Sequence, residues 1–390
     1  HSFPTRRSSD LLQGSECNSL FIDKHHIITD GTSEEIFYQE LGKLYAGNHL
    51  DAYDLHYKDY SVWFNQLKCN TERKWWNDYL SDYQQLELAT DYKQDKEHSS
   101  EGKTYRISID KSLVEKLHSF ALQNGISEYM VFFSSISILL SKMYHSEDFI
   151  LGTVTNGRIN EAVENMLGMF VNTLPIRVKP HSKLTVKEFI NNVKDNILTA
   201  ISNQNYQFEE IVKDLHATSG VRNPLFDCMF VYQNIEASRH YFDGKAKKNS
   251  YKTKKAKFPL TFEVEDANSN MQLLINYDSS LFMSKTIENL AARFIDTLKI
   301  IISSSEKKLS TIFLLTKQER SKLLDFKKVG EHKNVVDLFE NQVKLRPDDT
   351  ALRDNDKSFS YKELNTEVNK LANYLIDELE VKTEQKIPLM

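Results

Sequence analysis

The chain has 390 residues and a formal net charge of −5 at pH 7, with 40% hydrophobic and 27% charged residues. This balance is typical of a globular protein of two or three domains, and we expect neither nucleic acid nor a membrane as a partner. Its three cysteines lie far apart, which argues against a disulfide framework or a zinc-binding pair and indicates a cytoplasmic protein. The most apolar run, Met130–Leu140, is too short to cross a bilayer.

The first eleven residues, HSFPTRRSSDL, have no starting methionine, no hydrophobic signal region and no periodicity that continues into the following residues. They resemble an in-frame translation of a sequencing-library adapter. We therefore expect residues 1–11 to be non-native and leave them out of the fold prediction, with a natural disordered tail as the alternative. On this reading the chain starts in mid-protein.

The next part of the chain begins with an apolar segment that predicts a strand at Leu20–Ile28. A helix is expected directly after it, because Thr32 and Glu35 have the spacing of a capping box and apolar residues then recur on one face. Gly47 should end this helix. A second helical stretch holds the aromatic segment at residues 57–64 and the tryptophan pair at residues 75–76, and a polar loop follows to residue 103.

From residue 104 onward, short apolar segments alternate with amphipathic ones, and this mixture predicts an α/β sandwich. The predicted strands are Thr104–Ile109, Asp148–Arg158, Met169–Val178, Cys228–Asn234 and Met271–Tyr277, and the predicted helices are Lys111–Asn124, a helix running through Leu140, Val186–Gln204 and Ser284–Ile302.

The serine-rich stretch Ser303–Lys308 and the charged stretch Lys317–Lys333 predict a linker. The pattern then starts again with an amphipathic helix from Val335, a stop at Pro347, short strands and a helix at Tyr361–Leu379. We find no internal repeat.

The segment HHIITDG, His25–Gly31, is the strongest candidate for chemistry, as a metal site, a core segment or an acyl-transfer site. Adjacent residues on a strand point to opposite faces, so His25 and His26 could not both bind one ion, and no cysteine or histidine cluster lies nearby. This disfavours a metal. The same alternation lets one histidine face a substrate and makes the other structural. One buried and one exposed histidine before an Asp-Gly turn is the plain structural alternative.

Six stretches, taken in order, resemble the condensation domain of nonribosomal peptide synthetases. After the linker, LFENQVKLRPDDTAL and FSYKELN look like the opening of an adenylation domain. The six stretches are HHIITDG (His25–Gly31), YKDYSVWF (Tyr57–Phe64), DFILGTVTNGR (Asp148–Arg158), GMFVNTLPIR (Gly168–Arg177), NQNYQFEEIV (Asn203–Val212) and RNPLFDCMFVYQN (Arg222–Asn234).

This resemblance implies a two-lobed, chloramphenicol-acetyltransferase-like condensation fold with an incomplete first lobe, plus a small α/β stub of an adenylation domain. Residues 12–103 would be the C-terminal part of the first lobe and residues 104–315 the second lobe. Residues 316–334 would be the linker, and residues 335–390 the start of the adenylation domain.

The resemblance also implies an amide-forming acyltransferase. An acceptor aminoacyl amine would attack a donor thioester in a tunnel between the lobes, with both substrates carried on the 4′-phosphopantetheine of carrier proteins and no cofactor bound directly. The expected partners are the upstream and downstream peptidyl carrier proteins and the adjoining adenylation domain in cis. We expect the 390-residue chain alone to be inactive. An epimerization domain and a non-catalytic carrier-docking remnant are the alternatives.

By the family pattern His26 faces the tunnel, and Asp30 is structural and pairs with Arg158 across the lobes. A neutral histidine could accept a proton from the attacking amine or orient it, and the sequence does not separate these roles. Gly31 would let the turn and the substrate approach closely, with an ordinary turn glycine as the alternative.

Three amide side chains complete the candidate list. By resemblance Asn172, Gln233 and Asn234 line the tunnel or the bridge over it. The alternative is that each is a satisfied polar group of the core.

Overall fold

A computed structural model describes residues 9–14, 18–93, 101–217, 223–234, 255–267, 270–315, 319, 321, 334–354 and 357–382. It divides into two compact units, His1–Leu314 and Leu315–Met390.

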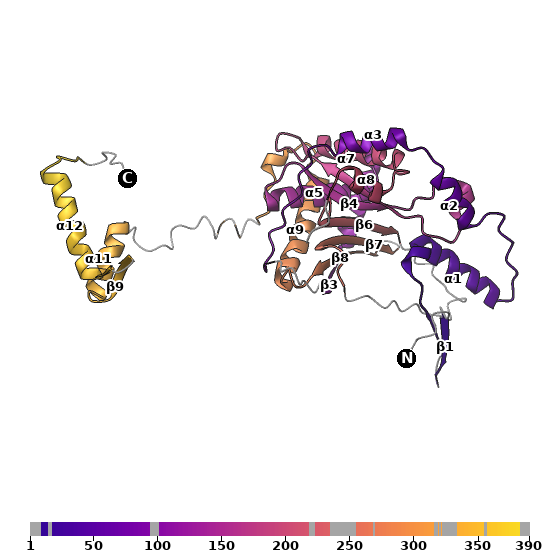
Figure 1. Ribbon diagram of the computed structural model, residues 1–390, viewed down its shortest axis with the longest axis horizontal. Helices are drawn as coiled ribbons and strands as arrows, with labels where there is room; N and C mark the ends of the chain where they lie inside the picture. The colour runs from indigo at the N-terminus through magenta and orange to yellow at the C-terminus, as the bar shows by residue number, and fades with distance from the viewer. Residues whose placement is uncertain are drawn as a thin grey trace. The chain divides into compact units, whose positions relative to one another are not determined.

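A six-stranded mixed sheet lies at the centre of the first unit, with the strand order β3-β8-β7-β6-β4-β5 (Figure 1). Strand β6 runs parallel to β4 and β7, and the other neighbours are antiparallel. Five of the strands were predicted, whereas β7 was not, although its sequence LTFEVEDA alternates apolar and polar residues. The strands are β3 (Gly102–Ser108), β4 (Phe149–Thr155), β5 (Asn172–Val178), β6 (Cys228–Asn234), β7 (Leu260–Ala267) and β8 (Asn270–Asp278).

Helices α4 (Lys111–Asn124), α5 (Glu128–Tyr144), α7 (Val186–Ser202) and α9 (Ser284–Ser303) pack with the sheet and with one another, as predicted. The ring of Phe294 on α9 lies 6.2 Å from the ring centroids of both Phe132 on α5 and Phe262 on β7. Helix α5 is buried almost all round, which explains why its sequence is apolar without a polar face. Its buried serines Ser135 and Ser137 donate to carbonyls one turn earlier.

The N-terminal part differs most from the prediction. Strands β1 (Ser9–Gln13) and β2 (Asn18–Ile22) form an antiparallel hairpin, so residues 9–11, which the sequence analysis left out, are part of a strand. The predicted strand Leu20–Ile28 is wrong beyond Ile22, because residues His26–Ile28 form the 3-10 turn η1.

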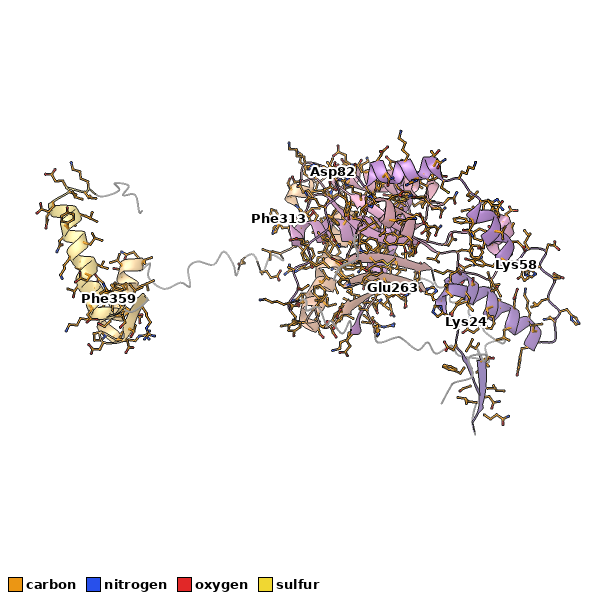
Figure 2. All side chains as sticks on the ribbon, viewed as in Figure 1. Lys24, Lys58, Asp82, Glu263, Phe313 and Phe359 are labelled. Atoms are coloured by element: carbon orange, nitrogen blue, oxygen red, sulfur yellow. The ribbon has the colours of Figure 1, made fainter. Side chains whose placement is uncertain are left out.

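Helix α1 (Gly31–Tyr45) begins earlier than predicted, because Asp30 and not Thr32 is its N-cap. A carboxylate in extended backbone directly before the helix is a strong cap, and it takes the N–H of the third helical residue. Gly47 ends α1 as predicted: its φ is +83°, and Gly47 and Asn48 donate to Leu44 and Lys43. Near the start of α1, the Lys24 amine lies 4.1 Å from the Phe37 ring centroid (Figure 2).

Helices α2 (Tyr57–Asn65) and α3 (Asn70–Tyr79) follow, and α3 fastens this part of the chain to the sheet region. The fully buried Trp76 donates its indole N–H to the Asn203 carbonyl at 2.9 Å. The Tyr79 hydroxyl donates to the carbonyl of Arg177 and accepts from its N–H, at 3.0 and 2.9 Å. Because β5 is the last strand, Tyr79 pairs groups that the sheet leaves free.

Three shorter helical segments complete the first unit: α6 (Glu161–Glu164), α8 (Phe208–Asp214) and η2 (Leu309–Thr311). Helix α8 contacts α3 and β5, and α7 also contacts β5.

The second unit contains α11 (Val335–Leu345), β9 (Thr350–Asp354), β10 (Lys357–Ser360) and α12 (Tyr361–Asp377), with the two strands antiparallel. Both helices begin with a capping box, at Asn334 and Ser360. Among the described residues of the whole chain, no single helix has the length and apolar character to span a membrane. One sharply bent pair, Lys111–Asn124 with Glu128–Tyr144, meets that test by length and composition alone.

Candidate active site

The histidine pair lies on the 3-10 turn between β2 and α1, and its two rings have opposite hydrogen-bonding roles. His25 caps the turn, with Nδ1 accepting the N–H of Ile27 at 3.1 Å. The Nδ1 of His26 lies 2.6 Å from the carbonyl oxygen of Thr29. A carbonyl only accepts, so this hydrogen bond assigns the proton to Nδ1 and leaves the Nε2 lone pair of a neutral His26 free.

Both histidines are exposed, as are their neighbours Ile27 and Ile28 at 69% and 61%. The two rings therefore differ because of the turn and not because of strand alternation, which was the reason given from sequence. The His26 ring is exposed to solvent.

Asp30 lies buried directly after the turn and holds both the helix start and a distant segment. Its Oδ1 accepts the N–H of Ser33 at 2.7 Å, and its Oδ2 accepts the N–H of Phe170 at 3.0 Å. Arg158 Nη2 lies 3.2 Å from Oδ1, and the two side chains are only 3% and 1% exposed. The structure thus brings Asp30 and Arg158 together, as the resemblance implied.

Arg158 binds more than the carboxylate. Its Nη1 donates to the carbonyls of Val163, Glu164 and Met166, which lie at the end of α6. Its guanidinium also lies 4.2 Å from the centroid of the Phe170 ring. One buried cation therefore orders the segment 163–170 and joins it to the start of α1.

Ser33 was missed by the sequence analysis. Its hydroxyl donates to the Gly168 carbonyl at 2.7 Å and accepts from the Gly168 N–H at 3.0 Å and from Arg158 Nη2 at 2.9 Å. A serine at the third helical position is also a common surface residue, so the sequence gives no signal for this contact across 135 residues.

Two glycines that the sequence analysis did not select are required by this packing. Gly157 has φ +64°, and an added Cβ would lie 1.9 Å from the Phe170 carbonyl oxygen. A Cβ on Gly168 would lie 2.1 Å from the Tyr57 ring. In contrast, among the described residues a Cβ on Gly31 would meet nothing within 4 Å beyond its chain neighbours and the backbone of its own helix, so the packing there does not require glycine.

Aromatic side chains of α2 hold the other side of the segment 163–170. The Tyr57 hydroxyl donates to the Met169 carbonyl at 2.7 Å, and the rings of Tyr57 and Tyr60 lie 5.2 and 4.8 Å from that of Phe170. Burial, and then the charge of Asp30, raise the pKa of the Tyr57 phenol. Burial, and then Tyr57, raise the pKa of Tyr60 to about 12.

The three amide candidates occupy different positions. Asn172 is buried, and its amide donates to the Gln204 carbonyl at 2.7 Å while its oxygen accepts the Phe208 N–H at 3.4 Å. Asn172 therefore holds the connection between α7 and α8 against β5. This is the role of a satisfied polar group in the core, the alternative to a position in the tunnel wall. Gln233 is exposed on β6, and Asn234 ends that strand, with its side chain outside the described residues.

No group of three or more His, Cys, Asp or Glu side chains is arranged to hold a metal ion in the part of the chain that the structure describes. The described site is a histidine with a free Nε2, exposed to solvent, on a turn fixed by a buried charge network. Such a group can accept a proton from a bound nucleophile or orient it by a hydrogen bond.

The model of the condensation domain family matches residues 9–324. Bacitracin synthase 1 of Bacillus licheniformis is 36% identical over 381 residues, which cover 95% of this chain and 7% of that protein. Gramicidin S synthase 2 of Brevibacillus brevis is 35% identical over 386 residues, which cover 95% of this chain and 9% of that protein. The chain thus spans less than a tenth of the length of these relatives.

Solved structures share the fold. A four-domain nonribosomal peptide synthetase bound to AMP and glycine superposes with a TM-score of 0.70 at 17% identity, covering 94% of this chain and 29% of that one. The first condensation domain of the CDA synthetase superposes with a TM-score of 0.63 at 16% identity, covering 79% of this chain and 70% of that one. The X-domain from teicoplanin biosynthesis superposes with a TM-score of 0.68 at 19% identity, covering 79% of this chain and 74% of that one.

Proposed function

Because the chain belongs to the condensation domain family, we propose that it forms peptide bonds in nonribosomal peptide synthesis. The α-amine of an acceptor aminoacyl group attacks the thioester carbonyl of a donor acyl or peptidyl group. A C–N bond forms, the C–S bond breaks, and the donor's thiol leaves with a proton. Both substrates are carried on the 4′-phosphopantetheine of carrier proteins.

The observation that carries this proposal is the orientation of the His26 ring. Its Nδ1 is engaged by the Thr29 carbonyl, so the neutral ring presents an unprotonated Nε2 on an exposed turn. This is the form of histidine that can receive a proton from the attacking amine.

The chemistry limits what His26 needs to do. A free α-amine has a pKa of about 7.7–8.0, so a useful fraction is neutral before attack. The attack creates an ammonium beside an oxyanion, and removal of that proton prevents collapse to the reactants. General-base catalysis of this kind raises the rate roughly 10²–10⁴-fold. Orientation of the amine by a hydrogen bond to the same Nε2 would also raise the rate.

Asp30 and Arg158 act through position. They are buried and paired with each other, with Ser33 and with backbone groups, so neither is free to touch a substrate. Gly31 leaves open space at the start of α1, which suits the approach of a substrate to His26. Gln233 and Asn234, at the end of β6, are proposed to line a tunnel in which the two thioesters meet.

The partners follow from the same proposal. Upstream and downstream peptidyl carrier proteins deliver the two thioesters, and residues 335–390 begin an adenylation domain that adjoins in cis. The alignments to bacitracin synthase 1 and gramicidin S synthase 2 support this, because each covers 95% of the chain and so extends past residue 324.

The test is an assay with the full synthetase and two carriers, one loaded with the donor and one with the acceptor. We expect a carrier-bound amide, detected by mass spectrometry of the released product. An inverted donor α-carbon without amide would instead identify an epimerization domain. Carrier binding with neither product would identify a docking remnant.

A further inference from the structure

Ser33 uses its whole hydrogen-bonding capacity to join two parts of the chain. It is 1% exposed on the first turn of α1. Its hydroxyl has one donor and two acceptor positions, and Gly168 and Arg158 occupy all three. The segment around Gly168 is itself fixed, by Arg158 at its start and by Tyr57 at Met169. Ser33 therefore attaches α1 to a rigid support.

A short path leads from Ser33 to the histidine. The N–H of Ser33 donates to the Asp30 carboxylate, which caps α1. Thr29, the residue before Asp30, is buried, and its carbonyl holds Nδ1 of His26. The position of the first turn of α1 thus sets the position of the carbonyl that orients the imidazole.

Tyr57 provides a contrast on the same segment. Its hydroxyl donates to the carbonyl of Met169, next to Gly168, at 2.7 Å. Tyr57 lies on α2, whereas Ser33 lies on α1. The N-cap of α1, Asp30, directly follows the turn that carries the histidines. Loss of either hydroxyl removes support from residues 168–170, but only loss of the Ser33 hydroxyl also removes a direct contact between α1 and Gly168. Asp30 still keeps its contacts with Arg158 and Phe170.

We propose that Ser33 is a positioning residue for His26, a role that rests on the proposed function. Its hydroxyl holds the first turn of α1 against Gly168, so that the Nε2 of His26 meets the acceptor amine at the angle required for proton transfer. Without it, the buried N–H and C=O of Gly168 lose their partner and the turn shifts. Small misplacements of a catalytic group cost up to about 10²-fold in rate.

The experiment compares Ser33→Ala, Ser33→Thr and Tyr57→Phe in the full synthetase, with donor- and acceptor-loaded carriers. Each variant is assayed at a temperature where its melting curve shows it to be folded. Ser33→Ala should lower kcat about 10- to 100-fold with the KM for the acceptor carrier unchanged. Tyr57→Phe should change kcat by less than about threefold, and Ser33→Thr, which keeps the hydroxyl, should recover most of the loss.

Equal losses of kcat in Ser33→Ala and Tyr57→Phe would overturn the proposal, because Ser33 would then only support the fold. A Ser33→Thr protein that folds but forms amide as slowly as His26→Ala would also overturn the proposal. If Ser33→Ala does not fold, the rate of Ser33→Thr is the deciding measurement. Failure of the proposed function gives a different result, since wild type would then form no amide.

Discussion

Asp30 shows how one buried carboxylate combines several tasks. It caps α1, accepts the Phe170 N–H and pairs with Arg158. Removing one side of a buried ion pair costs about 3–5 kcal/mol, because the other charge stays buried. We expect Asp30→Asn to lower the melting temperature and the condensation rate together.

Thermal unfolding followed by circular dichroism would measure this effect. Asp296→Asn is the matched control, because Asp296 pairs with Lys299 at the surface, where such pairs contribute little. It should leave the melting temperature unchanged. An Asp30→Asn curve that coincides with that of the control would remove the proposed bridging role.

The two classes of glycine in the site predict opposite outcomes. Gly31→Ala should keep or slightly raise the melting temperature, because a Cβ there meets open space and alanine loses less backbone freedom on folding than glycine. Its condensation rate should fall if the substrate approaches over Gly31. Gly157→Ala should lower the melting temperature strongly, because the new Cβ would collide with the Phe170 carbonyl at a positive φ.

Parallel melting curves and rate measurements on the two variants would separate the roles. A Gly31→Ala protein that is stable and fully active would leave Gly31 as an ordinary helix residue. A Gly157→Ala protein with the wild-type melting temperature would contradict the packing at Phe170.

At the scale of single residues, the resemblance to the family predicted the Asp30–Arg158 pair. Local sequence patterns could not predict the other residues that bind this pair or pack around it. Ser33, Gly157 and Gly168 act through contacts with residues distant in the chain or in a second segment, and neither periodicity nor spacing encodes those. Asn172 illustrates the reverse case. The same amide could line a tunnel or satisfy backbone groups, and only the fold shows the second.

At the scale of elements, the sequence predicted helix ends and buried strands well where one local signal dominates. Gly125 ends α4 in the left-handed region, and β6 has the predicted bounds Cys228–Asn234. The N-terminal part was harder. There, two signals compete, since Thr32 with Glu35 has the spacing of a capping box while Asp30 caps the helix two residues earlier.

The buried phenol of Tyr60 on helix α2 should make the stability of the protein depend on pH. Burial, and then the neighbouring Tyr57, raise the pKa of Tyr60 to about 12, compared with about 10 in an unfolded chain. The unfolded chain therefore loses this proton first. The stability that the neutral phenol provides is complete below pH 10 and is lost as the pH rises toward 12.

Tyr60→Phe removes the ionisable group and keeps the ring against Phe170. We expect its melting temperature to fall less than that of wild type between pH 10 and 12, measured as a difference between the two curves. Tyr92→Phe, at a side chain that is 46% exposed, is the control and should follow wild type. Identical alkaline slopes for all three proteins would contradict the role of burial at Tyr60.

At the scale of the whole molecule, the predicted fold class is confirmed by the mixed sheet with its packed helices and by the likeness to condensation domain structures. The order of the six motifs carried that prediction. The strand order could not be read from the motifs, because β6 pairs in parallel with both β4 and β7, and β7 was not recognised. The limits of the two lobes and the adenylation start remain predictions.

The whole molecule also explains why the histidine turn needs distant support. Its own hairpin, β1 with β2, exposes apolar residues such as Leu11 and Phe21, at 63% and 56%. The turn is instead fixed from the other side, through Asp30 and Ser33, to residues 158–170. The position of His26 is therefore set by two segments that are far apart in the chain and are held together.

The most direct test is single-turnover amide formation by the full synthetase carrying His26→Ala, beside wild type and His25→Asn. Asparagine at position 25 keeps an acceptor for the capping N–H of Ile27, so that variant should lose less activity. We predict that His26→Ala forms amide roughly 10²–10⁴-fold more slowly while both carriers still bind. Amide formation by His26→Ala at the wild-type rate would contradict the account.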